Sequence, residues 1–232
     1  MAHMMTESKH AQMFFTLKEF DAGKTLPIYF HKDDPSKVPP LLPKHVADSI
    51  PFSSSELPNL FRYFSISPTS PMGKAMTDAI QICEGEPIRG ETKACATSFE
   101  SMLDFVTRSF RTHARPQPLQ TTLPADAVSQ FQNYTIIDYV RVASPMMVPC
   151  HTVSYPYALY YCHYTDTETR VFMTSLQGEN GDRVESLAVC HMDTSLWSPD
   201  HISFKMLGVK PGMSHVCHFF PEDQMVWVPR KA

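Results

Sequence analysis

Four cysteines in the last third of this 232-residue chain are each followed directly by a histidine. Ten residues separate the first two pairs, 26 the next two and 25 the last two. The pairs are Cys150-His151, Cys162-His163, Cys190-His191 and Cys217-His218. Because the chain has six cysteines and 11 histidines, four such neighbours would rarely arise by chance. The repeat therefore needs a chemical reason.

The residues around every Cys-His pair predict β-strands. Adjacent side chains on a strand point to opposite faces of the sheet. If the cysteines point to one face, the four histidines gather on the other. This geometry argues against a single zinc ion held by neighbouring Cys and His, because zinc fingers usually place their cysteines two to four residues apart.

Disulfide pairing would leave the histidines as the only metal ligands of the motif. An even number of cysteines permits full pairing, and a disulfide leaves no thiolate for a metal. Imidazole sites suit copper, zinc, nickel and iron, and an oxidising compartment favours Cu(II) among them. His201 is a weaker candidate ligand, which could equally be a surface loop residue, and His215 is not expected to be a ligand. The alternative is a purely structural disulfide framework with hydrogen-bonded histidines.

The order of the cysteines favours local pairing. Cys150 and Cys162 flank one predicted hairpin and could be cross-strand neighbours, which leaves the last two to pair, although spacing alone does not fix connectivity. Cys83 ends one predicted helix and Cys95 precedes the next, so a bridge would staple the two, the alternative being two buried thiols. The expected disulfides are therefore Cys83–Cys95, Cys150–Cys162 and Cys190–Cys217.

Composition excludes several classes of partner. The net charge is −4, with no basic stripe, so nucleic acid is not an expected partner. No apolar run is long enough to span a bilayer, so no membrane anchor is expected. The even cysteine count and the N-glycosylation triplet at Asn133 favour an oxidising, secreted or vesicular compartment, and therefore the secretory pathway. No signal peptide opens this chain, and Met1-Ala2-His3-Met4 has the look of added residues.

The fold class predicted is α+β, with a helical N-terminal half packed on a β-rich, mainly antiparallel C-terminal half and stapled by disulfides. Residues 1–13 are expected to be a disordered leader or added residues, and 14–230 a single domain. Its helical part is about 44–110 and its β-rich part about 130–230, with a linker over 111–127.

Helical spacing of apolar residues predicts helices over 57–64 and 72–83. A capping box of Thr97 and Glu100 predicts the start of a third helix, which runs to Phe110. The β-branched and aromatic runs predict strands. The expected strands are 26–30, 134–142, 146–153 paired with 157–164, 170–176 paired with 184–191, and 204–209 paired with 215–220.

The four Cys-His dipeptides at these intervals resemble the signature of the plant BURP-domain family. Further stretches resemble other landmarks of that family, so the likeness covers roughly residues 14–230, and the unknown-seed-protein type is the nearest. These stretches are Phe14-Phe15, Ile50-Pro51-Phe52-Ser53, Cys83-Glu84, Cys95-Ala96-Thr97-Ser98-Phe99-Glu100-Ser101-Met102, Tyr155-Pro156-Tyr157-Ala158, Asp193-Thr194-Ser195-Leu196-Trp197 and Val216-Cys217-His218-Phe219-Phe220-Pro221.

The resemblance implies a copper-dependent, oxygen-requiring peptide cyclase, an oxidoreductase that makes ribosomally synthesised, modified peptides. Such members join a Trp or Tyr side chain to an unactivated carbon of a core peptide, and their Cys-His cysteines form disulfides while the histidines hold two copper ions. The ligands implied are His151, His163, His191 and His218, with His201 as an addition. No catalytic residue beyond the ligands is implied.

Two departures from the family pattern bear on this expectation. Members often carry a histidine after the final Pro-Glu-Asp, where this chain has Gln224, so one copper site is expected to be weakened or altered. Residues 1–13 contain neither Trp nor Tyr, so the core peptide is not in this chain and would be presented in cis in a longer precursor or in trans. The alternative function is a non-enzymatic secreted seed or cell-wall protein with a structural Cys-His framework, and a structural zinc protein is a third reading.

Overall fold

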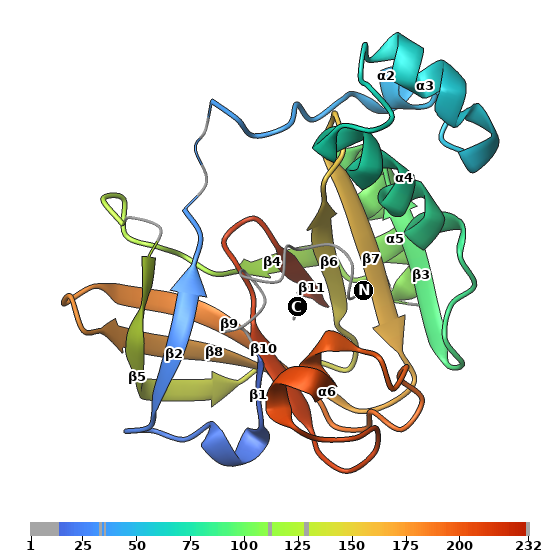
Figure 1. Ribbon diagram of the computed structural model, residues 1–232. Coiled ribbons are helices and arrows are strands. Elements are labelled where there is room, and N and C mark those ends of the chain that lie inside the picture. Colours follow the sequence, from blue (N-terminus) through green and yellow to red (C-terminus); the bar gives the residue numbers. More distant parts are fainter. Residues whose placement is uncertain (1–13, 33, 35, 111–112, 128–129, 231–232) are drawn as a thin grey trace.

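The fold is a mixed α+β arrangement of two antiparallel sheets (Figure 1). Its three disulfides lie within the first sheet, within the second sheet, and between a helix and a strand of the second sheet. The fold is seen in a computed structural model that describes residues 14–32, 34, 36–110, 113–127 and 130–230. The predicted leader, residues 1–13, lies outside the described residues. Within that described part, no helix combines the length and apolar character that crossing a bilayer requires.

The first sheet, called sheet A here, has six strands in the order β1-β10-β9-β8-β5-β2. The predicted hairpin around 170–191 is confirmed, because β8 and β9 pair antiparallel from Thr169 opposite His191 to Gln177 opposite Arg183. The strands of sheet A are β1 (Phe14–Phe15), β2 (Thr25–Phe30), β5 (Gln130–Arg141), β8 (Thr169–Gly178), β9 (Arg183–His191) and β10 (Val216–Phe219).

The second sheet, called sheet B, has five strands in the order β3-β7-β6-β11-β4. The predicted hairpin around 146–164 is also confirmed, since β6 and β7 pair antiparallel with Cys150 directly opposite Cys162. The strands of sheet B are β3 (Glu91–Ala96), β4 (Pro116–Gln120), β6 (Val148–Val153), β7 (Leu159–Thr165) and β11 (Met225–Pro229).

Helices cover sheet B, as Figure 1 shows for α4 and α5 beside β3 and β7. Met102 and Val106 of α5 pack against the face that carries Cys150 and Cys162. The helices are η1 (Leu17–Glu19), α2 (Lys44–Ala47), η2 (Ser54–Glu56), α3 (Leu57–Tyr63), α4 (Pro71–Glu84), α5 (Phe99–Ser109) and α6 (Ile202–Leu207). The predicted helices near 57–64 and 72–83 are confirmed as α3 and α4.

The two sheets meet through a compact apolar cluster. Val171 and Val189 of sheet A are fully buried against Val226 of sheet B, with Phe220 in the same cluster. Removing these side chains from water supplies the non-directional attraction that holds the sheets together. The packing brings one face of each sheet toward the other, and the functional site lies beside this cluster.

The prediction of a helical N-terminal half is wrong. Helices are scattered through the first half among four strands. Of these strands, β3 falls between two predicted helices, where no strand was expected, and β4 falls in the predicted linker. The reason is tertiary pairing: β3 aligns with β7 from Glu91 opposite Thr165 onward, and β4 aligns with β11. Pro116 and Pro118 suggest a linker when read alone, but an edge strand tolerates proline because one side needs no ladder hydrogen bond.

The predicted strand over 204–209 is also wrong, because residues 202–207 form α6. His201 caps this helix by accepting a hydrogen bond from the backbone N–H of Ser203, and Gly208 ends it with φ 63°. A left-handed residue at this place is the usual helix stop, and glycine adopts it without strain. The strand β10, which was expected to pair with 204–209, pairs instead with β9 and β1.

The cap of α5 lies one residue later than the sequence predicts. Ser98, not Thr97, is the N-cap, and its hydroxyl accepts a hydrogen bond from the N–H of Ser101 at 3.1 Å. Ser101 takes the place expected for Glu100 in a capping box. Serine is at least as good an N-cap as threonine, so the sequence alone did not decide whether Thr97 or Ser98 begins the helix.

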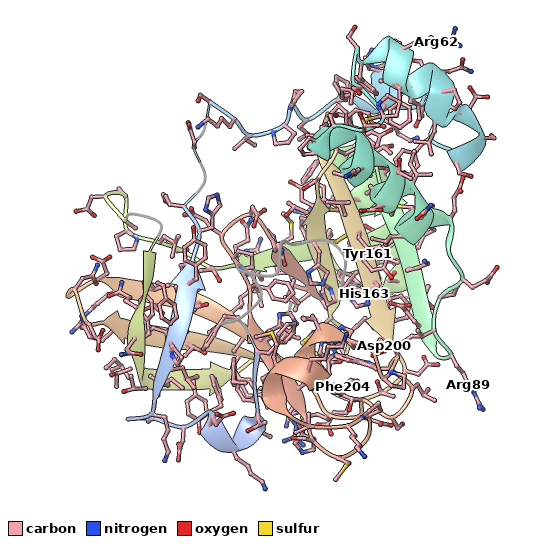
Figure 2. The ribbon with its side chains drawn as sticks, viewed as in Figure 1. Arg62, Arg89, Tyr161, His163, Asp200 and Phe204 are labelled. Atoms are coloured by element: carbon pink, nitrogen blue, oxygen red, sulfur yellow. A yellow bond between two sulfur atoms is a disulfide. The ribbon has the colours of Figure 1, made fainter. Side chains whose placement is uncertain are left out.

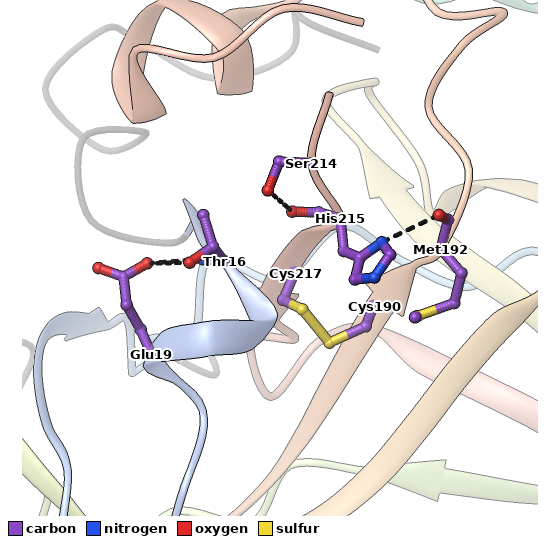
Figure 3. The surroundings of a disulfide bond; sticks show 7 residues. All are labelled: Thr16, Glu19, Cys190, Met192, Ser214, His215 and Cys217. Atoms are coloured by element: carbon purple, nitrogen blue, oxygen red, sulfur yellow. Dashed lines mark hydrogen bonds between the residues drawn. A yellow bond between two sulfur atoms is a disulfide. The ribbon is translucent and has the colours of Figure 1, made fainter. Parts of the chain in front are cut away.

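All six cysteines form the three expected disulfides, Cys83–Cys95, Cys150–Cys162 and Cys190–Cys217. The last two join directly opposed residues of neighbouring strands. Figure 3 shows the bridge between Cys190 and Cys217, with the loop beside it held by His215, whose Nδ1 donates to the carbonyl of Met192 at 3.0 Å. No thiolate therefore remains to bind a metal.

Candidate functional site

The two residues of each Cys-His pair lie on opposite faces of their sheet. Each pair stands on a strand, as predicted: β6, β7, β9 and β10. The cysteines of sheet B pack under α5, and those of sheet A join the apolar cluster on the far face of that sheet. The histidines take the other faces, and alternation along the strands brings the two sets toward the space between the sheets.

Four histidine rings form a row across the junction of the sheets. Ring centroids are 5.4 Å apart for His163 and His151, 6.3 Å for His151 and His218, and 5.7 Å for His218 and His191. Phe220 lies beside the middle of the row, 5.0 Å from His151 and 5.1 Å from His218. The sequence therefore located a real convergence of histidines from four different strands.

Within the row, the Nε2 atoms of His151 and His163 face each other at 3.3 Å. The Nδ1 atom of His151 lies 2.7 Å from the side-chain oxygen of Gln224. The Nδ1 atom of His163 lies 3.0 Å from a carboxylate oxygen of Glu91, close but not aligned as a hydrogen bond. Each ring thus offers its outer nitrogen to an oxygen and its inner nitrogen to the other ring.

This pairing has an electrostatic consequence. An oxygen acceptor beside Nδ1 favours a proton there, and a neutral imidazole then has an unprotonated Nε2. Two unprotonated nitrogens facing each other at 3.3 Å repel, and a cation between or beside them would relieve that repulsion. The pair therefore fits a metal ion that accepts imidazole nitrogen.

The surroundings keep three rings of the row, those of His151, His191 and His218, uncharged at neutral pH. Burial, followed by the charges of His163 and His218, lowers the pKa of His151 to about 3. Burial and the neighbouring histidines likewise lower the pKa of both His191 and His218 to about 3. A neutral imidazole is the form that binds metals, so these rings are ready ligands at neutral pH without first losing a proton.

Even so, the row is not a closed coordination sphere. Within the described part of the chain, no group of three or more His, Cys, Asp or Glu side chains is arranged to hold a metal ion. His191 and His218 are stacked, with 13° between their planes, so their nitrogens do not converge on one point. The His151–His163 pair offers two nitrogens.

The row opens into a cavity of about 1140 Å³. Aromatic side chains contribute to its walls, including Phe14, Tyr29, Tyr160 and Trp197, and all four histidines reach it. A second cavity of about 630 Å³ also reaches His163 and His191. His163 and His191 therefore line both cavities. In Figure 2, Tyr161 and His163 mark where β7 enters this region near the middle of the molecule.

His201 lies beside the row but is separated from it. The indole of Trp197 is 4.6 Å from His201 and 4.9 Å from His191, measured between ring centroids. Nδ1 of His201 accepts from Ser203 N as the cap of α6. In this arrangement His201 holds a helix end beside the cavity, and its predicted role as a ligand stays a prediction.

Asn133, the predicted glycosylation acceptor, is exposed on β5, and its amide donates to Glu179 at 2.8 Å.

Sequence reasoning missed two participants. Glu91 lies between two predicted helices, in a stretch for which no strand was predicted, because a single edge strand of six residues with mixed polarity gives a weak periodic signal. Trp197 was noted only as part of a family landmark. Gln224, by contrast, was singled out as a departure, and it does lie in the site, 2.7 Å from His151.

Comparison with known proteins agrees with the family resemblance that the sequence motifs suggested. The model of the BURP domain matches residues 13–229. The BURP domain-containing protein BNM2C of Brassica napus is 42% identical over 224 residues, covering 94% of this chain and 80% of that protein. The BURP domain protein USPL1 of Arabidopsis thaliana is 41% identical over 225 residues, with 94% and 80% covered.

A longer relative, Protein RAFTIN 1B of Triticum aestivum, is 38% identical over 222 residues, covering 93% of this chain and 59% of that protein. The family match extends from Phe14-Phe15 to the last strand, β11, and it includes all four Cys-His pairs. The chain belongs to the BURP domain family.

Proposed function

We propose that this chain is a copper-dependent, oxygen-requiring peptide cyclase, which joins a Trp or Tyr side chain of a core peptide to an unactivated carbon. The observation that carries the proposal is the His151–His163 pair, with Nε2 atoms 3.3 Å apart. Such a donor pair fits a borderline cation such as Cu(II) and not a hard cation, which would prefer oxygen. Copper, when bound with dioxygen available, supplies the oxidising power that crosslinking of unactivated carbon needs.

The disulfides support copper over structural zinc. Because every cysteine is oxidised, the thiolates of the usual structural zinc sites are missing. The Cys150–Cys162 bridge also fixes the two strands that carry His151 and His163. A rigid strand pair of this kind holds the donor nitrogens in place, which is what a preorganised site requires.

The cavity supports a peptide as the substrate. Its volume of about 1140 Å³ exceeds the range of about 300–1,000 Å³ typical of small-molecule pockets, so a segment of several residues has room. Phe14 and Trp197 stand beside the histidines and would stack on an aromatic side chain of the peptide.

The three disulfides and the exposed Asn133 favour the secretory pathway as the place of action. The core peptide would reach the cavity either in cis from a longer precursor or in trans.

The test is a crosslinking assay with defined metal content. The protein is stripped, loaded with Cu(II), and given a set of peptides that each carry one Trp or one Tyr, in air. A product lighter by two hydrogens, absent without oxygen and absent with Zn(II), is the expected result. His163→Ala should lose both copper and product, whereas the exposed His45→Ala should keep both. Copper binding without product on any peptide would favour the alternative, a non-enzymatic secreted protein.

A further inference from the structure

Two side chains outside the Cys-His motif contact the outer nitrogens of the paired histidines. Glu91 is the first residue of β3, and Gln224 directly precedes β11, so the two side chains reach the site from different strands of sheet B. Glu91 lies beside His163, and Gln224 lies beside His151. The Cys-His motif by itself predicts neither Glu91 nor Gln224.

Glu91 is held firmly in its position. The N–H of Ile88 donates to its Oε2 at 3.1 Å, and the hydroxyl of Tyr161 donates to its Oε1 at 3.1 Å. Its side chain is 5% exposed and that of His163 is 4% exposed. Both of these partners donate, so they hold the Glu91 carboxyl group as an acceptor. An ionised carboxylate can only accept hydrogen bonds, so Nδ1 of His163, 3.0 Å away, is favoured as N–H.

Gln224 plays the corresponding part for His151. Gln224 is 5% exposed, and its side-chain oxygen lies 2.7 Å from Nδ1 of His151. A carboxamide oxygen accepts and does not donate, so Nδ1 of His151 carries the proton as well. Free imidazole in a histidine side chain prefers the proton on Nε2, so both rings are held in their less common form.

We propose that Glu91 and Gln224 are positioning residues that hold the protons of His163 and His151 on Nδ1 and so direct both unprotonated Nε2 atoms at one point. The use of that point as a copper site rests on the function proposed above, but the proton positions do not. Ligand histidines commonly donate their second nitrogen to a carboxylate or carbonyl, which fixes the ring and raises its basicity. Here one ring has a carboxylate partner and the other an amide.

The test locates the protons directly in metal-free protein. Nitrogen-15 chemical shifts and two-bond couplings of the imidazoles report which nitrogen carries hydrogen. Wild type should show Nδ1–H for both His151 and His163 at neutral pH. Nε2–H in either ring would overturn the proposal for that ring. This measurement needs no variant, metal or substrate.

Variants then separate positioning from simple packing. Glu91→Leu should move the His163 proton toward Nε2 and leave His151 unchanged, and Gln224→Leu should do the reverse. Glu91→Gln and Gln224→Glu keep an oxygen acceptor and should keep Nδ1–H. If a leucine variant fails to fold, the acceptor-keeping variants and the wild-type spectrum still decide. Unchanged tautomers in folded leucine variants would contradict the proposal.

A second readout is Cu(II) affinity measured by competition with a chelator. Loss of an outer partner of a ligand histidine typically weakens metal binding about 10–100-fold, and each leucine variant should fall in that range. The matched control is Glu185→Leu, which removes an exposed carboxylate that accepts from Ser175 at 2.8 Å on sheet A. If wild type shows both Nδ1–H tautomers but binds no copper, the inference stands and the proposed function falls. Copper-dependent turnover by a protein whose rings carry Nε2–H would overturn the inference and leave the proposed function standing.

Discussion

His191 and His218 stack with ring centroids 5.7 Å apart and 13° between their planes, while the cysteines beside them are bonded to each other on the opposite face. Two stacked imidazoles cannot both carry charge without strong repulsion, and burial adds to that cost. The stack therefore makes the folded protein sensitive to acid.

Stability of the metal-free protein should fall as pH falls from about 6.5 toward 3. Burial and neighbouring histidines lower the pKa of His191 and His218 from 6.5 to about 3. In this window the unfolded chain binds protons that the folded chain does not, so the unfolding free energy decreases with decreasing pH and these groups contribute no slope above it. Urea denaturation in chelator across this range measures the slope. His191→Gln should reduce it by about one proton, and an unchanged slope would contradict the burial of that ring; His45→Gln, an exposed histidine, is the matched substitution.

The disulfide between Cys190 and Cys217 should do more than stabilise the fold. Replacing both cysteines by alanine should cost about 2–4 kcal/mol in urea denaturation. It should also shift the imidazole signals of His191 and His218, because the bridge fixes the strands that carry them. The control is the double replacement of Cys83 and Cys95, whose bridge joins α4 to β3.

That control should lose comparable stability and leave those two imidazole signals in place. Identical spectral changes in both double variants would mean that the Cys190–Cys217 bridge has no special part in placing the histidines. As an independent check, thiol titration of the denatured, unreduced protein should find no free thiol, since all six cysteines are paired.

More of the candidate site than of the fold could be predicted from the sequence. Alternation along strands was enough to predict that Cys150 and His151 lie on opposite faces, as do the other three pairs, because period-two geometry is rigid. That these faces belong to two sheets was not predicted. Alternation could not give the distance between Nε2 atoms or the order of the row, which depend on how the two sheets pack. Phe220 and Val226, which set that packing, carry no signal of their partners.

The errors in the fold have a common physical cause. β3, β4 and α6 are short, and their state is decided by neighbours far along the chain more than by local preference. Ile202–Leu207 has apolar residues that suit a strand as well as a helix, and the deciding features are the cap at His201 and the left-handed Gly208. Short elements of this kind are where tertiary context overrides propensity.

Gly208 offers a direct test of that helix end. Its φ is 63°, and a Cβ added there would meet no atom within 4 Å, so only backbone strain opposes a side chain. Gly208→Ala should therefore reduce the unfolding free energy by about 1–2 kcal/mol, measured by urea denaturation. Gly208→Asn should cost less, because asparagine tolerates the left-handed region. Equal losses for the two variants would point to a steric cause instead.

Trp197 should report metal binding at the histidine row by its fluorescence. Its indole lies 4.9 Å from His191 between ring centroids, whereas the chain's other tryptophan, Trp227, packs with Phe99 in the cluster under α5. Cu(II) quenches nearby indoles strongly, and the effect falls with distance. Added Cu(II) should therefore quench the emission of the wild type in a saturable way.

The two single-tryptophan variants assign that quenching. Trp197→Phe should remove most of the saturable part, because the remaining indole of Trp227 lies on the other face of sheet B from His151. Trp227→Phe should retain it, although that buried substitution will also lower stability. Zn(II) binds imidazole without quenching by the same route, so it should compete with Cu(II) and restore the emission. Quenching that persists in Trp197→Phe and disappears in Trp227→Phe would put the bound copper away from the row of histidines.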